Sequence, residues 1–359
     1  MRMTRAQQQE RTKGAVLSAA KWEFSHFGYA GAKVDRIAER AELTRGAVYS
    51  NFPSKRSLYL AVLLAAAASP MPDPPGELAG VASAVEAFAR VWLERLPLAT
   101  DEADAGRLAA RSLTGVVDDD QGRAALAQIT RVEGLLLGLA LESCRARGSG
   151  RQVRLAELLL TMLQGAAHLA ETAPGFGDPF DVARACRHLA GLPLADEWDP
   201  PHLPFVASAR PVHFTPAGFA ELLGGGAGGF VDLLSGRLVG FGDDGVLVVL
   251  GSGRLEAAEE AVRAARPGDT VTLAFVTDDP AETGALVRLR LTDLTTCLRR
   301  VFGHAIRPEV RVVLDDHGAL ATAIGLTAAA DTESAVRVRT GEIVARADGR
   351  GAGHAAASS

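Results

Sequence analysis

Residues 34–55, VDRIAERAELTRGAVYSNFPSK, decide how the N-terminal part of the chain folds. In the first half, apolar side chains recur at the spacing of one helix face, at Val34, Ile37, Ala38 and Ala41. Glu42 and Leu43 then form a short corner. Thr44 stands where the N-cap of a second helix belongs, because its hydroxyl can accept a backbone N–H. We therefore predict two short helices joined by a tight turn.

The second helix, over residues 45–51, is too short and too polar to build a core. Such a pair is a helix-turn-helix, whose second helix presents its N-terminal residues to the major groove of DNA. This recognition helix opens with Thr44, Arg45, Gly46 and Ala47. We expect Arg45 to reach a base edge or a phosphate, because arginine is the usual reader of guanine. The two small residues after it would let the helix approach closely.

The pattern extends over residues 16–63, VLSAAKWEFSHFGYAGAKVDRIAERAELTRGAVYSNFPSKRSLYLAVL. This run resembles the TetR family of bacterial transcriptional repressors in the pieces Ala19-Ala20, Phe24, Gly28-Tyr29, Ile37-Ala38, Ala41, Thr44, Gly46, Tyr49, Phe52 and Ser54-Lys55. The resemblance implies that Tyr49 and Lys55 hold DNA phosphates, which fix the register of the protein without reading sequence.

The sequence departs from the family just before Val34. TetR-family proteins usually carry Thr or Ser there, as a helix cap and phosphate contact, whereas this chain has Ala32 and Lys33. The cap is lost and a cation is gained, so we expect Lys33 to add a phosphate contact. The full set of expected DNA-binding residues is Lys33, Thr44, Arg45, Gly46, Ala47, Tyr49, Ser50 and Lys55.

The charge distribution supports a DNA-binding end. Residues 1–60 hold 11 Lys and Arg against 5 Asp and Glu, a net charge of +6 in a chain of −5, so the remainder carries −11. A basic end on an acidic chain is typical of a nucleic-acid-binding domain attached to another module. A solvated helical surface could give the same excess, but here the positive charge coincides with the helix-turn-helix.

Length and composition favour two or three domains in a reducing compartment. The cysteines are three and far apart, Cys144, Cys186 and Cys297, which argues against a disulfide framework or a zinc knuckle. The polar N-terminus lacks the apolar core of a signal peptide, and no uncharged stretch reaches the length of a membrane span. We expect a cytoplasmic protein with no cofactor, no metal and no membrane partner.

Residues 77–192 have a helical pattern throughout, with helices expected over 77–96, 102–116, 121–147, 151–172 and 179–191. The TetR resemblance implies that this region binds a small-molecule effector and forms a homodimer through its last two helices. The apolar stripe Leu155, Leu158, Leu159, Met162 and Leu163 fits that pairing or the chain's own core. An effector cavity could use Trp92, Arg107, Arg111, Leu136 and Glu142, although each also fits core or surface.

The periodicity changes after a proline- and acid-rich stretch, 193–204, which we expect to be a linker. Strands are expected over 245–251, 270–276, 310–314, 335–339 and 342–346, with helices over 255–265, 293–302 and 319–324. This order predicts a mixed sheet, parallel at its centre, with an antiparallel hairpin at one side. We expect residues 351–359 to be a disordered tail.

Residues 205–350 resemble a thioredoxin-like or peroxiredoxin-like domain in this order of elements. The local sequences LDDHGALATAIGL (314–326) and VRVRTGEIVARADG (336–349) are also similar to those of thioredoxins and peroxiredoxins. However, GSGRLEAAEEA (251–261), where the redox cysteine of that family should follow the first strand, has none. Cys297 lies in the middle helix, away from that position. The resemblance therefore implies a domain without thiol chemistry.

Taken together, the chain is expected to be multidomain. An all-α TetR-like region consists of a helix-turn-helix domain (1–55) and an effector-binding and dimerisation domain (56–192), and an α/β thioredoxin-like domain (205–350) follows. We expect a ligand-responsive dimeric repressor, not an enzyme, that binds double-stranded DNA at a palindromic operator. One alternative is a regulator fused to an active redox or peroxidase-type enzyme domain. The missing cysteine argues against that alternative, and we expect the C-terminal domain to be a non-catalytic accessory module for protein interaction or dimerisation.

Overall fold

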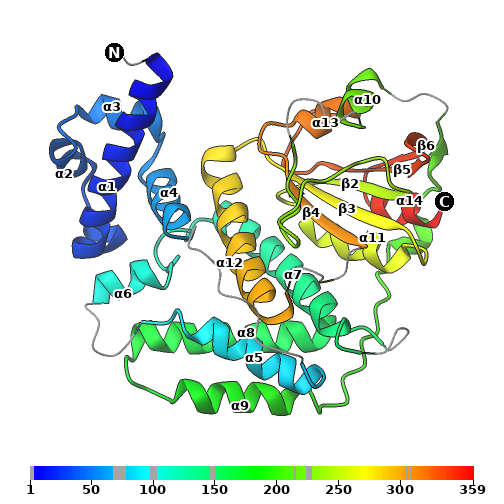
Figure 1. Ribbon diagram of the computed structural model, residues 1–359, viewed down its shortest axis with the longest axis horizontal. Helices are drawn as coiled ribbons and strands as arrows, with labels where there is room; N and C mark the ends of the chain where they lie inside the picture. The colour runs from blue at the N-terminus through cyan, green and yellow to red at the C-terminus, as the bar shows by residue number, and fades with distance from the viewer. Residues whose placement is uncertain are drawn as a thin grey trace.

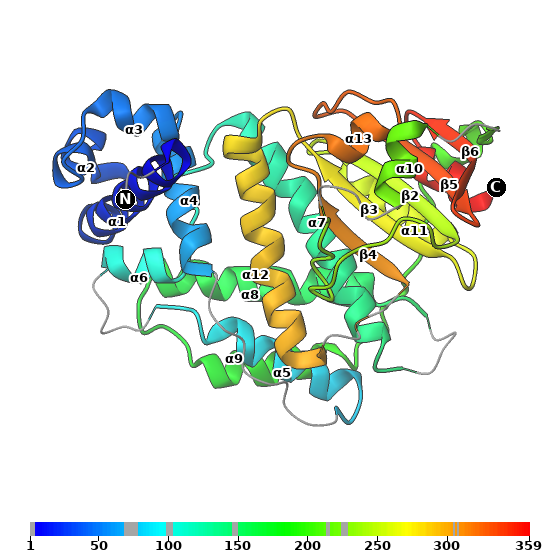
Figure 2. The same ribbon diagram turned by 45° about the horizontal axis from the view of Figure 1, so that its top comes forward.

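The computed structural model describes residues 4–67, 78–97, 103–145, 150–212, 216–223, 229–303, 306 and 309–359. A helical N-terminal half lies beside a C-terminal α/β half (Figure 1). One long helix of the C-terminal half, α12 (Ala285–Phe302), stands between them, and the turned view shows the same placement (Figure 2).

The first four helices are α1 (Arg5–Gly31), α2 (Val34–Arg40), α3 (Arg45–Asn51) and α4 (Lys55–Ala67). A capping box fixes the start of α1, in which the Thr4 hydroxyl accepts the Gln7 N–H at 3.3 Å. A kink interrupts α1 at Gly28, whose φ of 62° is readily adopted only by glycine. The predicted stripe of α2 is buried at Val34, Ile37 and Ala38. The helix-turn-helix geometry expected from the sequence is therefore present.

The middle helices are α5 (Val81–Leu93), α6 (Ala103–Ala109), α7 (Asp120–Glu142), α8 (Val153–Thr172) and α9 (Pro179–Leu189). By length and composition α7 could cross a membrane, but 67% of its most apolar stretch is buried inside the protein. A helix that is apolar on most sides and covered by neighbours is typical of a protein core. In α8, Leu155, Leu159 and Leu163 are buried in that core as well.

The C-terminal half contains a mixed sheet with the strand order β1-β6-β5-β2-β3-β4. The bounds are β1 (Arg210–Pro211), β2 (Gly245–Gly251), β3 (Thr270–Val276), β4 (Val310–Leu314), β5 (Glu333–Arg339) and β6 (Glu342–Asp348). Strands β2, β3 and β4 are parallel, and β5 and β6 form an antiparallel hairpin beside them. The predicted mixed sheet is confirmed, whereas its likeness to thioredoxin stays a prediction.

Helices cover both faces of this sheet (Figure 1). On one face, α10 (Ala217–Leu223) and α13 (Ala319–Ala323) enclose a small apolar cluster that includes Phe219, Val249 and Leu320. The other face carries the short helix η2 (Leu255–Ala257), α11 (Ala258–Ala264) and α14 (Ala352–Ser358). The apolar core of this second face is continuous with the core of the helical half. The two halves therefore share one hydrophobic core.

Helix α12 makes this continuity possible because it packs against α4, α5 and α7 of the helical half. It follows a single π-helical turn, η3 (Pro280–Gly284). Its side chains Leu291, Leu294 and Leu298 are completely buried. Fully burying an apolar side chain of this size stabilises the fold by roughly 1.5–3 kcal/mol. The sequence predicted helix only from residue 293, so the observed helix is eight residues longer at its start.

Charged pairs fix α12 in place. Arg290 donates to both carboxylate oxygens of Glu133 on α7, at 2.9 and 2.5 Å, and the Glu133 side chain is only 1% exposed. Asp293 forms ion pairs with Arg95 and Arg111 of the helical half. The predicted effector-cavity residue Arg111 therefore contacts α12. Trp92 and Leu136 of that set are buried core residues.

The prediction of a disordered tail over residues 351–359 is wrong. Helix α14 occupies residues 352–358, and its Ala356 and Ala357 are fully buried. Arg337, 3% exposed, donates to their carbonyl oxygens at 3.2 and 3.3 Å. The small side chains allow close packing, since a Cβ added at Gly353 would lie 2.9 Å from the Ala261 Cβ. The small residues of this segment therefore allow close packing of α14 on α11 and do not indicate disorder.

The expected linker, 193–204, connects the halves but is fastened to both. Its Asp196 accepts the Val153 N–H at 2.8 Å at the start of α8. The same carboxylate pairs with Arg263 on α11 at 2.6 Å. A further short helix, η1 (Leu203–Phe205), ends the stretch.

We predict that Arg290→Ala destabilises the protein by about 3–5 kcal/mol, because Glu133 would remain as a buried carboxylate without its partner. The matched control is Arg300→Ala, whose partner Glu94 is 56% exposed; it should cost no more than about 1 kcal/mol. Urea unfolding of the full chain measures both. Equal losses for the two variants would contradict the role assigned to the buried pair.

Candidate nucleic-acid interface

The recognition helix α3 lies at the outer edge of the helical half, away from the sheet (Figure 2). Within it only Val48 is buried. Thr44 is its N-cap and accepts the Ala47 N–H at 3.2 Å, as predicted. Of the expected contact residues, Lys33, Thr44, Arg45, Gly46 and Ser50 are exposed, and Ala47, Tyr49 and Lys55 are half-buried. A short helix held by one buried residue and exposed at its N-terminal end can enter a DNA groove.

Gly46 has open space in front of it. A Cβ added there would meet only the Thr44 Oγ1, at 3.9 Å, within 4 Å. The fold of the chain therefore does not require glycine at this position. The lack of a side chain is useful only toward something outside the chain.

Lys33 precedes α2 and makes no side-chain cap, in agreement with the departure seen in the sequence. Its backbone N–H donates instead to the Glu23 Oε1 at 3.0 Å. The Glu23 side chain is 1% exposed and also accepts the Arg36 Nε–H at 2.6 Å. Helix α1 thus anchors the backbone at the first residue before α2, and the Lys33 side chain is exposed to solvent. The sequence does not predict this role of Glu23; the one feature that could have indicated it is a carboxylate within the apolar stripe of a helix.

Arg45 is held loosely. Its guanidinium donates to both Asp35 oxygens at 3.2 and 3.3 Å and lies 5.4 Å from the centre of the Tyr49 ring. Both side chains of the ion pair are more than half exposed. Exposed ion pairs contribute little in water, so DNA can replace Asp35 as the partner. The expected base or phosphate contact of Arg45 stays a prediction.

Lys55 and Ser50 have partners inside the chain. The Lys55 Nζ donates to the Ala30 carbonyl oxygen at 3.2 Å and lies 4.9 Å from the centre of the Tyr29 ring. Burial lowers the pKa of Lys55. The Ser50 hydroxyl donates to the Ala47 carbonyl oxygen at 2.9 Å. Phosphate contacts by either residue, and by Tyr49, remain predictions.

The start of α4 is tied to the C-terminal half. The Ser54 hydroxyl accepts the Ser57 N–H at 2.9 Å and donates to a carboxylate oxygen of Glu282 in η3. Arg56 pairs with the other oxygen of Glu282 at 3.1 Å and with Asp119. The segment that follows the recognition helix is therefore bonded to the turn that leads into α12. The sequence does not indicate a role for Glu282, because nothing around it predicts a contact with residue 54.

The cysteines offer no activated thiol. Cys297 faces the helical half from α12, and burial raises the pKa of its thiol despite the nearby Arg95 guanidinium. Burial raises the pKa of Cys186 to about 11. Reactive cysteines need a lowered pKa and access to solvent. Across the described ranges, no group of three or more His, Cys, Asp or Glu side chains is placed to hold a metal ion.

The family model described as bacterial regulatory proteins, tetR family, matches residues 16–62. The chain is 47% identical over 51 residues to the HTH-type transcriptional regulator RutR of Escherichia coli K12, which covers 14% of this chain and 24% of RutR. It is 31% identical over 94 residues to the HTH-type transcriptional repressor SCO4008 of Streptomyces coelicolor, covering 25% of this chain and 43% of that protein. The chain thus spans less than half the length of these curated relatives. Its N-terminal region carries a TetR-family DNA-binding domain.

Among solved structures, NalD of Pseudomonas aeruginosa is similar at 20% identity. It is described as the secondary repressor of the MexAB-OprM multidrug efflux pump. The match covers 53% of this chain and 99% of NalD, with a TM-score of 0.35, which is too low to establish a shared fold.

We predict that Gly46→Ala keeps or slightly raises stability but weakens DNA binding by about 1–3 kcal/mol, because a methyl group enters a closely packed groove contact. The matched control is Gly14→Ala in α1, where an added Cβ also meets nothing within 4 Å. It should raise stability by roughly 0.5–1 kcal/mol and leave DNA binding unchanged. Thermal unfolding and fluorescence anisotropy with duplex DNA check both. Unchanged DNA binding in Gly46→Ala would remove Gly46 from the interface.

Proposed function

We propose that this protein is a cytoplasmic, sequence-specific DNA-binding transcriptional regulator that acts as a ligand-responsive repressor. The observation that carries the proposal is the exposed N-terminal end of α3, where Thr44 caps the helix and Gly46 leaves its surface open. The net charge of +6 over residues 1–60 supports it, since binding to the phosphate backbone needs cations. The tetR family model matches residues 16–62, which include α3.

Dimerisation is proposed through α8 and α9. A groove of about 790 Å³ lies between the end of α5 and these two helices, lined by apolar side chains that include Met162 and Leu169. At its edge Phe176 and Phe180 are 71% and 64% exposed. Exposed apolar patches of this kind mark interaction sites. We assign the face to a second copy of the chain, because two such copies would bury each other's aromatic side chains.

A dimer with two-fold symmetry would place two recognition helices on a near-palindromic operator. Ligand binding would shift the population toward a conformation whose recognition helices no longer match the operator. The size of that shift is set by the difference in ligand affinity between the two conformations.

We assign the C-terminal α/β half a non-catalytic role as a brace for the DNA-binding domain. The contacts of Glu282 with Ser54 and Arg56 support this role, because they join the turn before α12 to the helix after α3. Along α12, the buried Glu133–Arg290 pair adds a second attachment. The segment after β2, residues 251–261, contains no cysteine. The alternative of a redox enzyme therefore has no support.

The proposed function predicts that purified full-length protein enriches one near-palindromic sequence from a random duplex library. Arg45→Ala should relax the preference at one position in each half-site, at a cost of about 1–3 kcal/mol for the original sequence. Asp35→Asn, which removes the negative charge beside Arg45 and keeps the guanidinium, is the control and should keep the preference. No enrichment at low salt would contradict the proposed function.

The proposed dimer predicts that Phe180→Asp halves the molar mass of the protein in solution. A charge placed in an apolar interface loses its hydration without gaining a partner, so the dimer should weaken by several kcal/mol, roughly 2–5. Phe205→Asp changes a side chain that is 88% exposed and lies outside this face, and it should leave the mass unchanged. Analytical ultracentrifugation decides. A monomeric wild-type protein would refute this assignment.

A further inference from the structure

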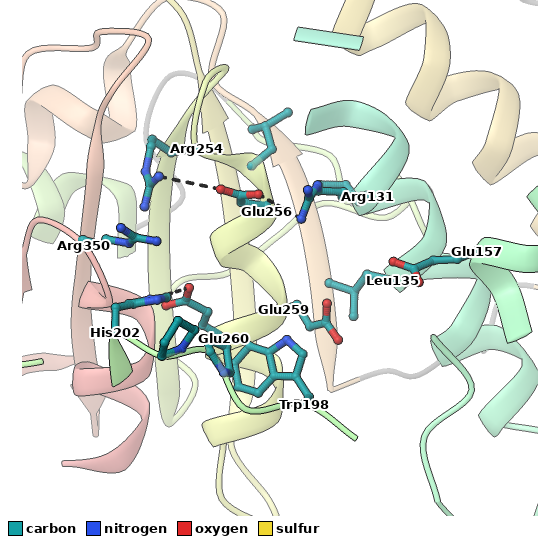
Figure 3. A pocket seen from close by; sticks show the side chains of 14 residues that line it. Arg131, Leu135, Glu157, Trp198, His202, Arg254, Glu256, Glu259, Glu260 and Arg350 are labelled. Carbon is teal, nitrogen blue, oxygen red and sulfur yellow. Dashed lines mark ion pairs between the residues drawn. The ribbon is translucent and has the colours of Figure 1, made fainter. Parts of the chain in front are cut away.

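A pocket of about 200 Å³ lies where three parts of the chain meet (Figure 3). Helices α7 and α8 contribute Arg131 and Glu157, and the connecting stretch contributes Trp198 and His202. The α/β half supplies its remaining polar side chains from the segment 254–260 and from Arg350. This volume is smaller than the roughly 300–1,000 Å³ of sites for drug-sized ligands, so it suits a small metabolite.

One end of the pocket is cationic. Arg131, Arg254 and Arg350 approach it from three different elements (Figure 3). Glu256 lies between two of them, 3.1 Å from Arg131 and 3.7 Å from Arg254. Arg254 also pairs with the buried Glu333 at 2.6 Å, so Arg131 and Arg350 are the guanidinium groups more open to a ligand. Arg350 is exposed and has no ion-pair partner within the described part of the chain. The Glu256 carboxylate therefore marks where a ligand carboxylate would find guanidinium groups, and Arg350 supplies an additional one.

The other end of the pocket contains a buried carboxylate, Glu260, with one oxygen that accepts no hydrogen bond. The Glu260 side chain is 8% exposed, and its Oε1 lies 2.9 Å from the His202 Nε2. That contact lacks the alignment of a good hydrogen bond, and the Glu260 Oε2 accepts no hydrogen bond. Leaving a buried charged oxygen without a donor costs more than leaving a neutral one. Glu259 and Trp198 lie at the same end (Figure 3), but Glu259 already pairs with Arg263 at 2.6 Å.

We propose that this pocket binds a small zwitterion of amino-acid size, with its carboxylate on the arginines and its ammonium group on Glu260. Neither a simple anion nor a simple amine would satisfy both ends. An anion alone would leave the Glu260 Oε2 without a donor. A simple amine would bring no carboxylate to the cationic end, so Arg350 would still have no ion-pair partner there.

The position of the pocket gives its ligand a route to the DNA-binding domain. Arg131 lies on α7 two residues from Glu133, which holds α12 through Arg290. The turn before α12 carries Glu282, which contacts Ser54 and Arg56. Binding itself does not depend on the proposed function, but any effect of the ligand on operator affinity rests on it. Calorimetry tests the first without reference to DNA.

The experiment is isothermal titration calorimetry of the full-length protein with each standard amino acid as a separate probe, at about 10 mM. We expect at least one to bind with a Kd near or below about 1 mM. Its analogues that lack the amino group or the carboxylate should bind about tenfold more weakly or not at all. If none of the amino acids binds, or if either analogue binds as tightly as the parent, the proposal is overturned.

Two variants locate the site. Glu260→Gln should weaken binding at least about tenfold, and Arg350→Gln should weaken it several-fold, on the order of 3–10. The matched controls are Glu221→Gln on α10 and Arg184→Gln on α9, which are exposed elsewhere and should leave binding unchanged. Because Arg350 is exposed, its variant keeps the test valid even if Glu260→Gln fails to fold. Unchanged affinity in Arg350→Gln and in folded Glu260→Gln would place any binding at another site and refute this one.

Discussion

The buried pair between Glu133 and Arg290 is the interaction on which the arrangement of the two halves depends. Glu133 points from the central helix of the N-terminal half toward α12, and its side chain is almost completely removed from water. A carboxylate in that position is tolerated only with a well-aligned partner, and the forked guanidinium supplies it. Because the partner is contributed by the C-terminal half, the helical half is complete only when α12 is docked. The shared apolar core follows from the same fact.

This constraint changes how the extra domain relates to the DNA-binding end. The helical half and the α/β half are not independent domains joined by a flexible linker, since the connecting stretch is bonded to both through Asp196. Glu282 then extends the contact to the first turn of α4. Any change in the α/β half therefore has a physical path to the segment next to the recognition helix. Whether that path carries regulation depends on two conformations that a ligand can tell apart.

The sequence predicted the parallel strands closely, because runs such as Val246 to Leu250 are rich in β-branched residues and bounded by glycines. It also located Thr44 as a cap, since capping is local chemistry. It missed the first half of α12, where Val287-Arg-Leu-Arg-Leu-Thr alternates apolar and charged residues in the manner of a strand. The two arginines there are satisfied by Asp316 and Glu133, which only the tertiary fold provides. The roles of Glu23 and Glu282 could not be predicted for the same reason. Helix α14 was not predicted because a run of small residues indicates a loop unless other elements pack against it.

The insertion of α12 also shapes how the protein is made. Arg290 follows Glu133 by 157 residues in the chain. At a synthesis rate of about 5–20 residues per second, the helical half waits roughly 8–30 s on the ribosome before that partner is made. During this interval an acidic side chain and the apolar surface meant for α12 are open to solvent and to other chains. Contacts this distant in sequence slow folding. Production of this protein should therefore depend on chaperones that shield the growing helical half until the C-terminal half arrives.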